Sequence, residues 1–139
     1  MATRIHHINF ASKTPEVLTS FYKDVLEMNN TDAYKSHHTQ ITDRGYGSRV
    51  DFITDGVTEM HLSTKDMNVG FRTGQAINPM ERGHLAFRTD DIEAIKRRLT
   101  EREIPFSDYG NWAIEGWHQI FFHDPEGNIV EVHQVSSCK

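Results

Sequence analysis

The first pattern along the chain is an alternation of apolar and polar residues, which is typical of a strand with one buried face. It occurs in residues 4–11 and again in residues 83–89. The two segments match at one offset, because 84 − 7 = 77 aligns His84 with His7 and the same step aligns the apolar positions that follow. A long internal repeat of this kind predicts one supersecondary unit used twice, with the two histidines in equivalent places.

Each of these strands precedes a helical pattern. Residues 15–26 predict a helix whose apolar face recurs at i, i+3, i+4 and i+7. The side chains of that face are Leu18, Phe21, Tyr22 and Val25. In the second half, Asp90 or Asp91 is the expected N-cap of a helix that Pro105 prevents from continuing.

Two hairpins account for the remaining strand patterns. The first turns at Asp55-Gly56, and the second has the type I turn signature Asp124-Pro125-Glu126-Gly127. Their strands are expected at residues 49–54, 58–63, 119–123 and 128–134. The other segments are a polar stretch at 27–48 with one short strand, a connector at 64–82 and a loop at 108–117. Each half is thus strand, helix and then two or three strands, which predicts an α+β fold of tandem βαβββ modules.

Composition favours one folded domain over residues 1–139, with repeats at about 4–63 and 83–134. The chain is 37% hydrophobic and 25% charged, and its net charge of −5 argues against nucleic acid or an anionic membrane as a partner. The single cysteine, Cys138, excludes an internal disulfide. No apolar run predicts a membrane span or a signal peptide, so a cytoplasmic protein is expected. Nine histidines are many for this length and direct attention to metal binding.

Strand parity gathers potential metal ligands on one face of the sheet. In four of the predicted strands an apolar pair occupies one face, where it is expected to lie under the helices, and a histidine or glutamate occupies the other. The residues that would converge are His7, His61, His84 and Glu131. A divalent metal binds neutral imidazole nitrogens and carboxylate oxygens at about 2.0–2.2 Å and keeps a position open for water or substrate. Four strands of one curved sheet can supply that arrangement.

Other interpretations of the histidines stand beside this one. A histidine on a strand is more often a hydrogen-bonded core or surface residue than a ligand. His6 competes with His7, although its parity puts it on the apolar face. If Glu131 lay on an edge strand, His133 would be its solvated neighbour. Loop, turn or surface positions are expected for His37, His38, His118 and His123.

Three further residues are candidates for substrate binding. Trp112 and Trp117 fall in the predicted loop, where they would either wall a pocket or pack down as a lid on the core. Arg88 has the parity of the ligand face, where it would hold an anionic substrate group, or it is a surface arginine at the end of its strand.

Four segments carry a family resemblance. They are Ile5-His6-His7-Ile8-Asn9-Phe10, Phe21-Tyr22-Lys23-Asp24-Val25-Leu26, Gly83-His84-Leu85-Ala86-Phe87 and the run Phe121-Phe122-His123-Asp124-Pro125-Glu126-Gly127-Asn128-Ile129-Val130-Glu131. Over about residues 4–134 the chain resembles the glyoxalase/bleomycin-resistance/extradiol-dioxygenase group, the vicinal oxygen chelate superfamily, and in particular its glyoxalase I-like (lactoylglutathione lyase-like) members. The resemblance implies two βαβββ modules whose mixed sheet forms a cup, with the helices outside, around a divalent metal (Zn, Ni, Co, Mn or Fe).

The resemblance also implies a ligand set. It places ligands at His7, His84 and Glu131, with a fourth on the strand of His61, where glyoxalase I-like members usually have a glutamate. Glu59 lies two positions before His61 on the same face. A second departure is Leu26-Glu27 in place of the usual Leu-Gly, so the first helix is expected to end without the left-handed residue that glycine supplies.

The chemistry implied is chelation of two neighbouring oxygens on a small-molecule substrate, possibly a thiol adduct such as a hemithioacetal. A base would move a proton through an enediolate, with Glu131 as the first candidate and His61 as the second. The alternatives are an Fe(II) extradiol dioxygenase, a thiol transferase acting on an antibiotic, and a non-enzymatic bleomycin-resistance-like binding protein. The group also implies a homodimer, and the sequence leaves open whether one chain or two complete the site.

Overall fold

The computed structural model describes residues 2–31 and 45–136, so the predictions for His37, His38 and Cys138 lie outside the described residues. The first half contains β1 (Thr3–Ser12), α1 (Pro15–Leu26), β2 (Asn29–Asn30), β3 (Val50–Thr54) and β4 (Glu59–Thr64). A short helix, α2 (Val69–Thr73), lies in the predicted connector. The second half contains β5 (His84–Thr89), α3 (Ile92–Glu101), β6 (Phe106–Asn111), β7 (Trp117–His123) and β8 (Ile129–Val135).

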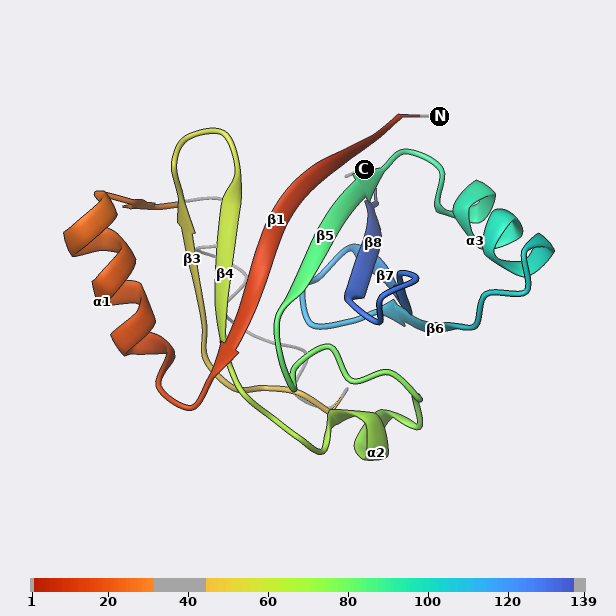
Figure 1. Ribbon diagram of the computed structural model, residues 1–139, viewed down its shortest axis with the longest axis horizontal. Coiled ribbons are helices and arrows are strands. Elements are labelled where there is room, and N and C mark those ends of the chain that lie inside the picture. The colour runs from red at the N-terminus through yellow and green to blue at the C-terminus, as the bar shows by residue number, and fades with distance from the viewer. Residues whose placement is uncertain (1, 32–44, 137–139) are drawn as a thin grey trace.

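All eight strands form one sheet in the order β2-β3-β4-β1-β5-β8-β7-β6 (Figure 1). β1 pairs in parallel with β4, and β5 pairs in parallel with β8, while β1 and β5 are antiparallel to each other. Ile8 lies opposite Leu85 in the β1–β5 pair, and 85 − 8 is again 77. A two-fold axis that relates the halves therefore passes between these two residues. The α+β fold of paired βαβββ units is confirmed.

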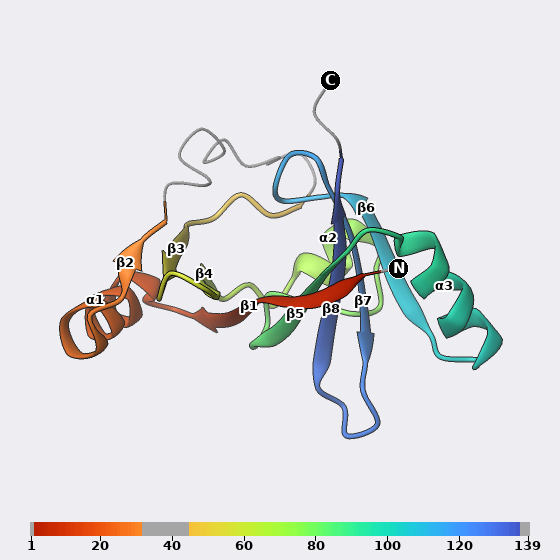
Figure 2. The ribbon, with the colours of Figure 1, turned by 90° about the horizontal axis from the view of Figure 1, so that it is seen from above.

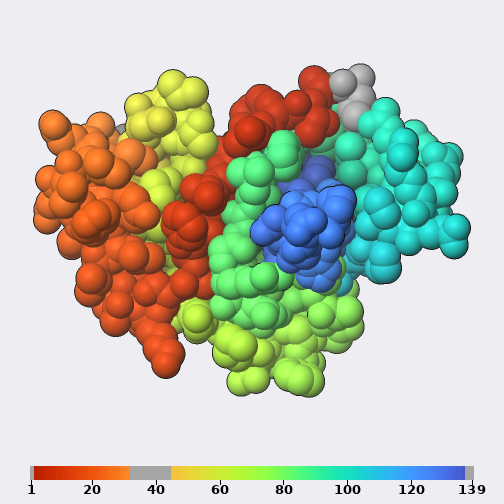
Figure 3. Space-filling view, in the orientation of Figure 1, coloured from red at the N-terminus to blue at the C-terminus, as the bar shows by residue number. Residues whose placement is uncertain are grey.

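The two longer helices lie at opposite ends of the molecule (Figure 2). α1 contacts β3 and β4, and α3 contacts β8. Between the helices β1 and β5 reach the surface, as Figure 3 shows, and Leu85 keeps 36% of its surface exposed. The outer apolar side chains of the central strands are therefore only partly covered, in contrast to the expectation that they lie under the helices.

The helix ends follow local chemistry. Asp91 is the N-cap of α3, since its side chain accepts a hydrogen bond from the Ala94 backbone N–H at 3.1 Å. At the end of α1, Glu27 itself adopts the left-handed conformation with φ of 57°. The prediction that this helix would end without a left-handed residue is therefore wrong. On α1 the predicted apolar face is not buried, because Phe21 is 52% and Val25 60% exposed.

The predicted loop at 108–117 is in part a strand. β6 runs to Asn111 and pairs with β7, with an irregularity in the register between Asp108 and Gly110. Gly110 has a positive φ of 63°, which a β-bulge accommodates easily when the residue is glycine. This bulge hides the strand from a search for regular alternation. None of the helices among the described residues is long and apolar enough to span a membrane.

Candidate metal centre

Four strands bring the four predicted ligands to one pocket on the concave side of the sheet. His7 lies on β1, His61 on β4, His84 on β5 and Glu131 on β8, and each is buried. They line a pocket of about 410 Å³, counted with the solvent at its mouth. One chain supplies all four side chains, so the cluster needs no residue from a second copy.

The His84 side chain directs one of its ring nitrogens at the Glu131 carboxylate. Its Nδ1 lies 3.0 Å from the carbonyl oxygen of Pro79, and its Nε2 lies 3.0 Å from Oε1 of Glu131. A carbonyl oxygen only accepts, so Nδ1 carries the proton, and in a neutral imidazole Nε2 then carries a lone pair. A lone pair that faces a carboxylate oxygen at this distance is repelled unless a proton or a cation lies between them.

His7 points at the same carboxylate oxygen from the neighbouring strand. Its Nε2 is 3.6 Å from Oε1 of Glu131, is fully buried and has no hydrogen-bond partner. Burial lowers the pKa of the His7 imidazole, which favours its neutral form. Two imidazole nitrogens and one carboxylate oxygen thus converge, and this is the donor set that divalent transition metals prefer. The residues fit the metal that the resemblance implies.

The second oxygen of Glu131 is anchored by neighbours. His133 Nδ1 donates to Oε2 at 2.7 Å, and the Gln119 amide lies 3.4 Å away. His133 Nε2 in turn accepts a hydrogen bond from the Arg88 guanidinium at 3.0 Å. Burial alone would raise the pKa of the Glu131 carboxyl, but the nearby His7 and the hydrogen bond from His133 hold that pKa well below its usual value. Glu131 is therefore an ionised carboxylate with a fixed orientation.

His133 is a functional candidate that the sequence analysis passed over. It is fully buried, and its interpretation as a solvated neighbour of Glu131 is wrong. His133 lies two positions after Glu131 on the same face of the strand, and this shared face was the sequence signal that could have identified it. The position of β8 between β5 and β7 excludes an edge strand, and the rings of Trp117 and His6, with centroids 3.9 Å and 5.0 Å from that of His133, cover its face.

His61 lies beside His7 in a different arrangement. The two rings stack with centroids 3.6 Å apart and planes 16° apart, and His61 Nε2 is hydrogen-bonded to Oε1 of Glu59 at 2.8 Å. Burial, with His7 nearby, lowers the pKa of His61 well below its usual value. The lone pairs of stacked rings lie in parallel planes, so one ion cannot lie in the plane of both. The geometry therefore favours a place for His61 beside the ion, with its coordination as the fourth ligand remaining a prediction.

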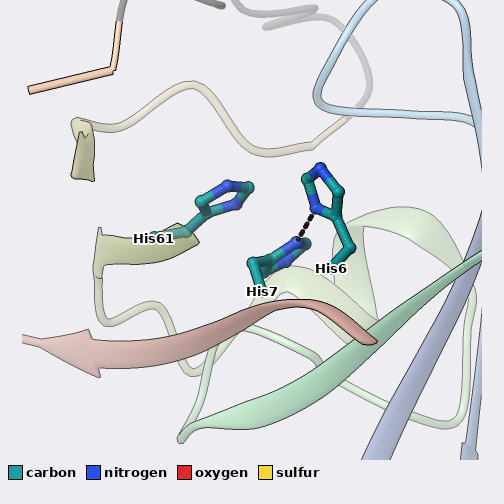
Figure 4. Close-up of side chains that lie close together, drawn as sticks. All are labelled: His6, His7 and His61. Atoms are coloured by element: carbon teal, nitrogen blue, oxygen red, sulfur yellow. Dashed lines mark hydrogen bonds between the residues drawn. The ribbon is translucent and has the colours of Figure 1, made fainter. Parts of the chain in front are cut away.

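His6 also faces the cluster, because a β-bulge interrupts β1. The register between β1 and β5 shifts between Ile5 and His7, which leaves His6 as the extra residue. Its Nδ1 lies 2.9 Å from Nδ1 of His7 (Figure 4), and burial together with His7 lowers the pKa of His6 to about 3. The parity assignment of His6 to the apolar face is therefore wrong.

The predicted substrate-binding residues occupy different places. Trp112 and Trp117 both line the pocket, the first from the β6–β7 loop and the second from the start of β7. The remaining apolar lining includes Phe52, Met80, Ile114 and Phe121. Arg88 is not among the described residues that line it: its guanidinium contacts His133 and lies 5.0 Å from the centre of the Trp117 ring. Its role as a ligand for an anionic group remains a prediction.

The two other described histidines lie apart from this cluster. His118 pairs with Asp108 at 2.8 Å, and His123 is exposed at the end of β7. Both places agree with the surface and turn positions expected for them.

Comparison with known proteins adds to this geometry. The sequence matches the family described as Glyoxalase/Bleomycin resistance protein/Dioxygenase superfamily over residues 4–132. Among curated proteins, none matches the sequence significantly.

Solved structures share the fold at low sequence identity. A hypothetical protein from Bacillus halodurans is 16% identical with a TM-score of 0.69, covering 100% of this chain and 99% of its own. A methylmalonyl-CoA epimerase from Mycobacterium tuberculosis is 18% identical with a TM-score of 0.67, covering 96% and 88%. A glyoxalase/bleomycin resistance protein/dioxygenase superfamily member from Vibrio splendidus is 17% identical with a TM-score of 0.58, covering 96% and 99%. At these identities the likeness shows the fold alone.

Proposed function

Because the chain belongs to the glyoxalase/bleomycin resistance/dioxygenase superfamily, we propose that it is a divalent-metal-dependent enzyme of the glyoxalase type. It binds a small substrate through two neighbouring oxygens and moves a proton on the carbon beside them. The observation that carries the proposal is the convergence of His7 Nε2 and His84 Nε2 on Oε1 of Glu131, at the floor of a buried pocket.

His7, His84 and Glu131 would hold the metal. A divalent ion bound there supplies Lewis-acid stabilisation of the negative charge that develops on the substrate oxygens, worth several kcal/mol of the barrier. Zn, Ni, Co, Mn and Fe all accept this donor set. The side chain of Glu131 keeps its orientation through Oε2, which His133 holds at 2.7 Å.

The same residues offer two bases for the proton transfer. Glu131 is ionised, so it is the first candidate to take a proton from the substrate carbon, and it would release or loosen its bond to the metal to do so. His61 is the second, since its Nε2–H is engaged by Glu59 and its other ring nitrogen then carries a lone pair. Trp112 and Trp117 line the pocket in which this reaction would take place. A thiol adduct of a 2-oxoaldehyde remains the leading substrate.

A second function is favoured by the ligand count. Two histidines and one carboxylate with open positions are also the set that non-haem Fe(II) oxygenases use. An Fe(II) extradiol dioxygenase would therefore employ the same His7, His84 and Glu131, and the identity of the metal separates the two functions.

The proposal extends to assembly and location. We propose a homodimer, which the resemblance implies, and we propose the cytoplasm as its location, which rests on the sequence expectation alone. Support for a protein contact comes from α1, where Val17, Phe21, Val25 and Leu26 are each more than half exposed. Sedimentation velocity measures the mass directly, and a monomer at micromolar concentration would contradict this part of the proposal.

Metal analysis of freshly purified protein tests the function. The wild type is expected to carry bound divalent metal, His84→Ala to lose it, and His123→Ala, which changes an exposed histidine, to retain it. Zn, Ni or Co together with isomerisation of a hemithioacetal would support the glyoxalase type. Fe with cleavage of a catechol ring would favour the dioxygenase instead. A wild-type protein that binds no divalent metal contradicts both.

A further inference from the structure

The bulge in β1 breaks the two-fold symmetry at one position next to the candidate metal centre. His6 occupies it in the first half, and 83 − 6 = 77 identifies Gly83 as the equivalent residue in the second half. A Cβ at Gly83 would lie 2.6 Å from the backbone oxygen of Asn9, so that side has no room for a side chain. Bulges near active sites commonly turn an extra side chain toward the site. His6 is such a side chain, and only the first half carries it.

His6 joins two carboxylates through His7. Oε2 of Glu59 lies 3.6 Å from His6 Nε2, and His6 Nδ1 lies 2.9 Å from His7 Nδ1. On its far side His7 presents Nε2 to Glu131 at 3.6 Å. A neutral imidazole carries one N–H, so the N–H groups of His6 and His7 must either both point toward Glu59 or both point toward Glu131. Only one of the two directions leaves a lone pair on His7 Nε2.

We propose that His6 and Glu59 are positioning residues for the metal, because they hold the proton of His7 on Nδ1 and thereby leave Nε2 free to bind the ion. In this arrangement His6 Nε2–H points toward Glu59, and His7 Nδ1–H donates to His6 Nδ1. The inference rests on the proposed function, since it concerns the affinity of the same metal site. Metal-binding histidines generally donate their second N–H to an oriented acceptor, and loss of that acceptor typically costs 10–100-fold in affinity.

The other ligand histidine shows the same device with a different acceptor. His84 donates Nδ1–H to the backbone oxygen of Pro79, which no substitution of a side chain removes. The acceptor for His7 is itself a side chain, so it can be tested by mutation.

A different use of the same nitrogens conflicts with the ring geometry. Ligand atoms of His6, His7 and His61 lie within 4.8 Å of one another, which is close enough for a second ion. However, the His7 and His61 rings are stacked 3.6 Å apart, and their in-plane lone pairs do not meet at one point. The hydrogen bond between His6 and His7, with a carboxylate 3.6 Å beyond each of the two rings, accounts for these positions better.

The test compares two replacements of one residue. His6→Leu removes the acceptor at similar volume, whereas His6→Asn keeps an acceptor close to the place of Nδ1. Zn²⁺ affinity is measured for both by competition with a chromophoric chelator, together with Glu59→Gln and with His123→Leu as an exposed control. We expect His6→Leu to bind Zn²⁺ about 10–100-fold more weakly than the wild type. His6→Asn should recover most of that loss, Glu59→Gln should lose less than His6→Leu, and the control should equal the wild type.

The outcomes separate this inference from the proposed function. If the wild type binds Zn²⁺ and His6→Leu binds it equally well, the positioning role is wrong while the metal site stands. Equal losses in His6→Leu and His6→Asn would also overturn it, because a role in packing alone does not depend on an acceptor. If the wild type itself binds no Zn²⁺, the proposed function fails and this inference fails with it.

Discussion

The substitution Glu131→Gln replaces one oxygen by an amide nitrogen in the middle of the buried cluster. In the structure, Oε1 of Glu131 faces His84 Nε2 at 3.0 Å and His7 Nε2 at 3.6 Å. A glutamine can turn its NH₂ toward these two nitrogens and its carbonyl oxygen toward His133 Nδ1–H. The variant thus supplies the donors that the metal-free wild type lacks and removes a buried charge.

The expected magnitude follows from these contacts. A buried polar group left without a partner costs about 1–3 kcal/mol, so metal-free Glu131→Gln should be more stable than the metal-free wild type by about that amount. For a chain of this size the melting temperature should rise by about 3 °C for each kcal/mol. With metal at 100 times its dissociation constant, the wild type gains about 2.7 kcal/mol, while the variant gains little because its amide oxygen is a weaker ligand. The difference in stability between Glu131→Gln and the wild type therefore becomes smaller or changes sign when metal is added.

Thermal unfolding with and without Zn²⁺ measures the effect, after removal of bound metal with a chelator. Glu126→Gln makes the same chemical change at an exposed carboxylate and should leave both values unchanged. A metal-free Glu131→Gln that is less stable than the metal-free wild type would refute the reasoning. It would mean that the groups around Glu131 already compensate its carboxylate, so that the cluster is complete without a metal.

Three further outcomes follow from the structure. Folding lowers the pKa of His6 from 6.5 to about 3, so below pH 6.5 the His6 imidazole takes up a proton in the unfolded chain before it does so in the folded protein. The free energy of unfolding should therefore drop by up to about 1.4 kcal/mol for each unit of pH below 6.5. The lowered pKa of Glu131 also reduces the free energy of unfolding as the pH falls, at lower pH than His6 does. Urea unfolding across pH 4–7 measures this free energy, and it would stay constant if the two side chains were solvated. Gly83→Ala should cost about 1–3 kcal/mol, since its Cβ would lie 2.6 Å from the Asn9 oxygen, and an unchanged urea midpoint would contradict that contact. Glu27→Gly should raise the stability by about 1 kcal/mol, because Glu27 has a φ of 57°, and a lower melting temperature would show that its side chain contributes more than the conformation costs.

The fold could be predicted from the sequence because its signals are local and repeated. The offset that aligned His7 with His84 is the relation that places Ile8 opposite Leu85 in the sheet. Parity along each strand brought His61 and the other predicted ligands to one pocket, since side-chain direction depends only on counting by two.

The predictions fail where a bulge interrupts the alternation of side chains along a strand, or where contacts with other strands determine whether a side chain is buried. The bulge at His6 inserts one residue, so the side chains before it point to the opposite face from the one that alternation predicts. No local feature of the sequence marks this bulge. The burial of His133 depends on the Trp117 ring, which stacks on it from β7, and on His6 from β1. The stacking of His61 on His7 is a matter of side-chain rotation, which strand patterns do not contain.

X-ray absorption of the protein loaded with one equivalent of Zn²⁺ tests the central claim most directly. The claim is that His7, His84 and Glu131 bind one ion together. We predict a first coordination shell of nitrogen and oxygen at about 2.0–2.2 Å that contains two imidazoles, and the loss of this shell in His84→Ala, which no longer binds the ion. A spectrum without imidazole ligands, or one that His84→Ala leaves unchanged, would contradict the account.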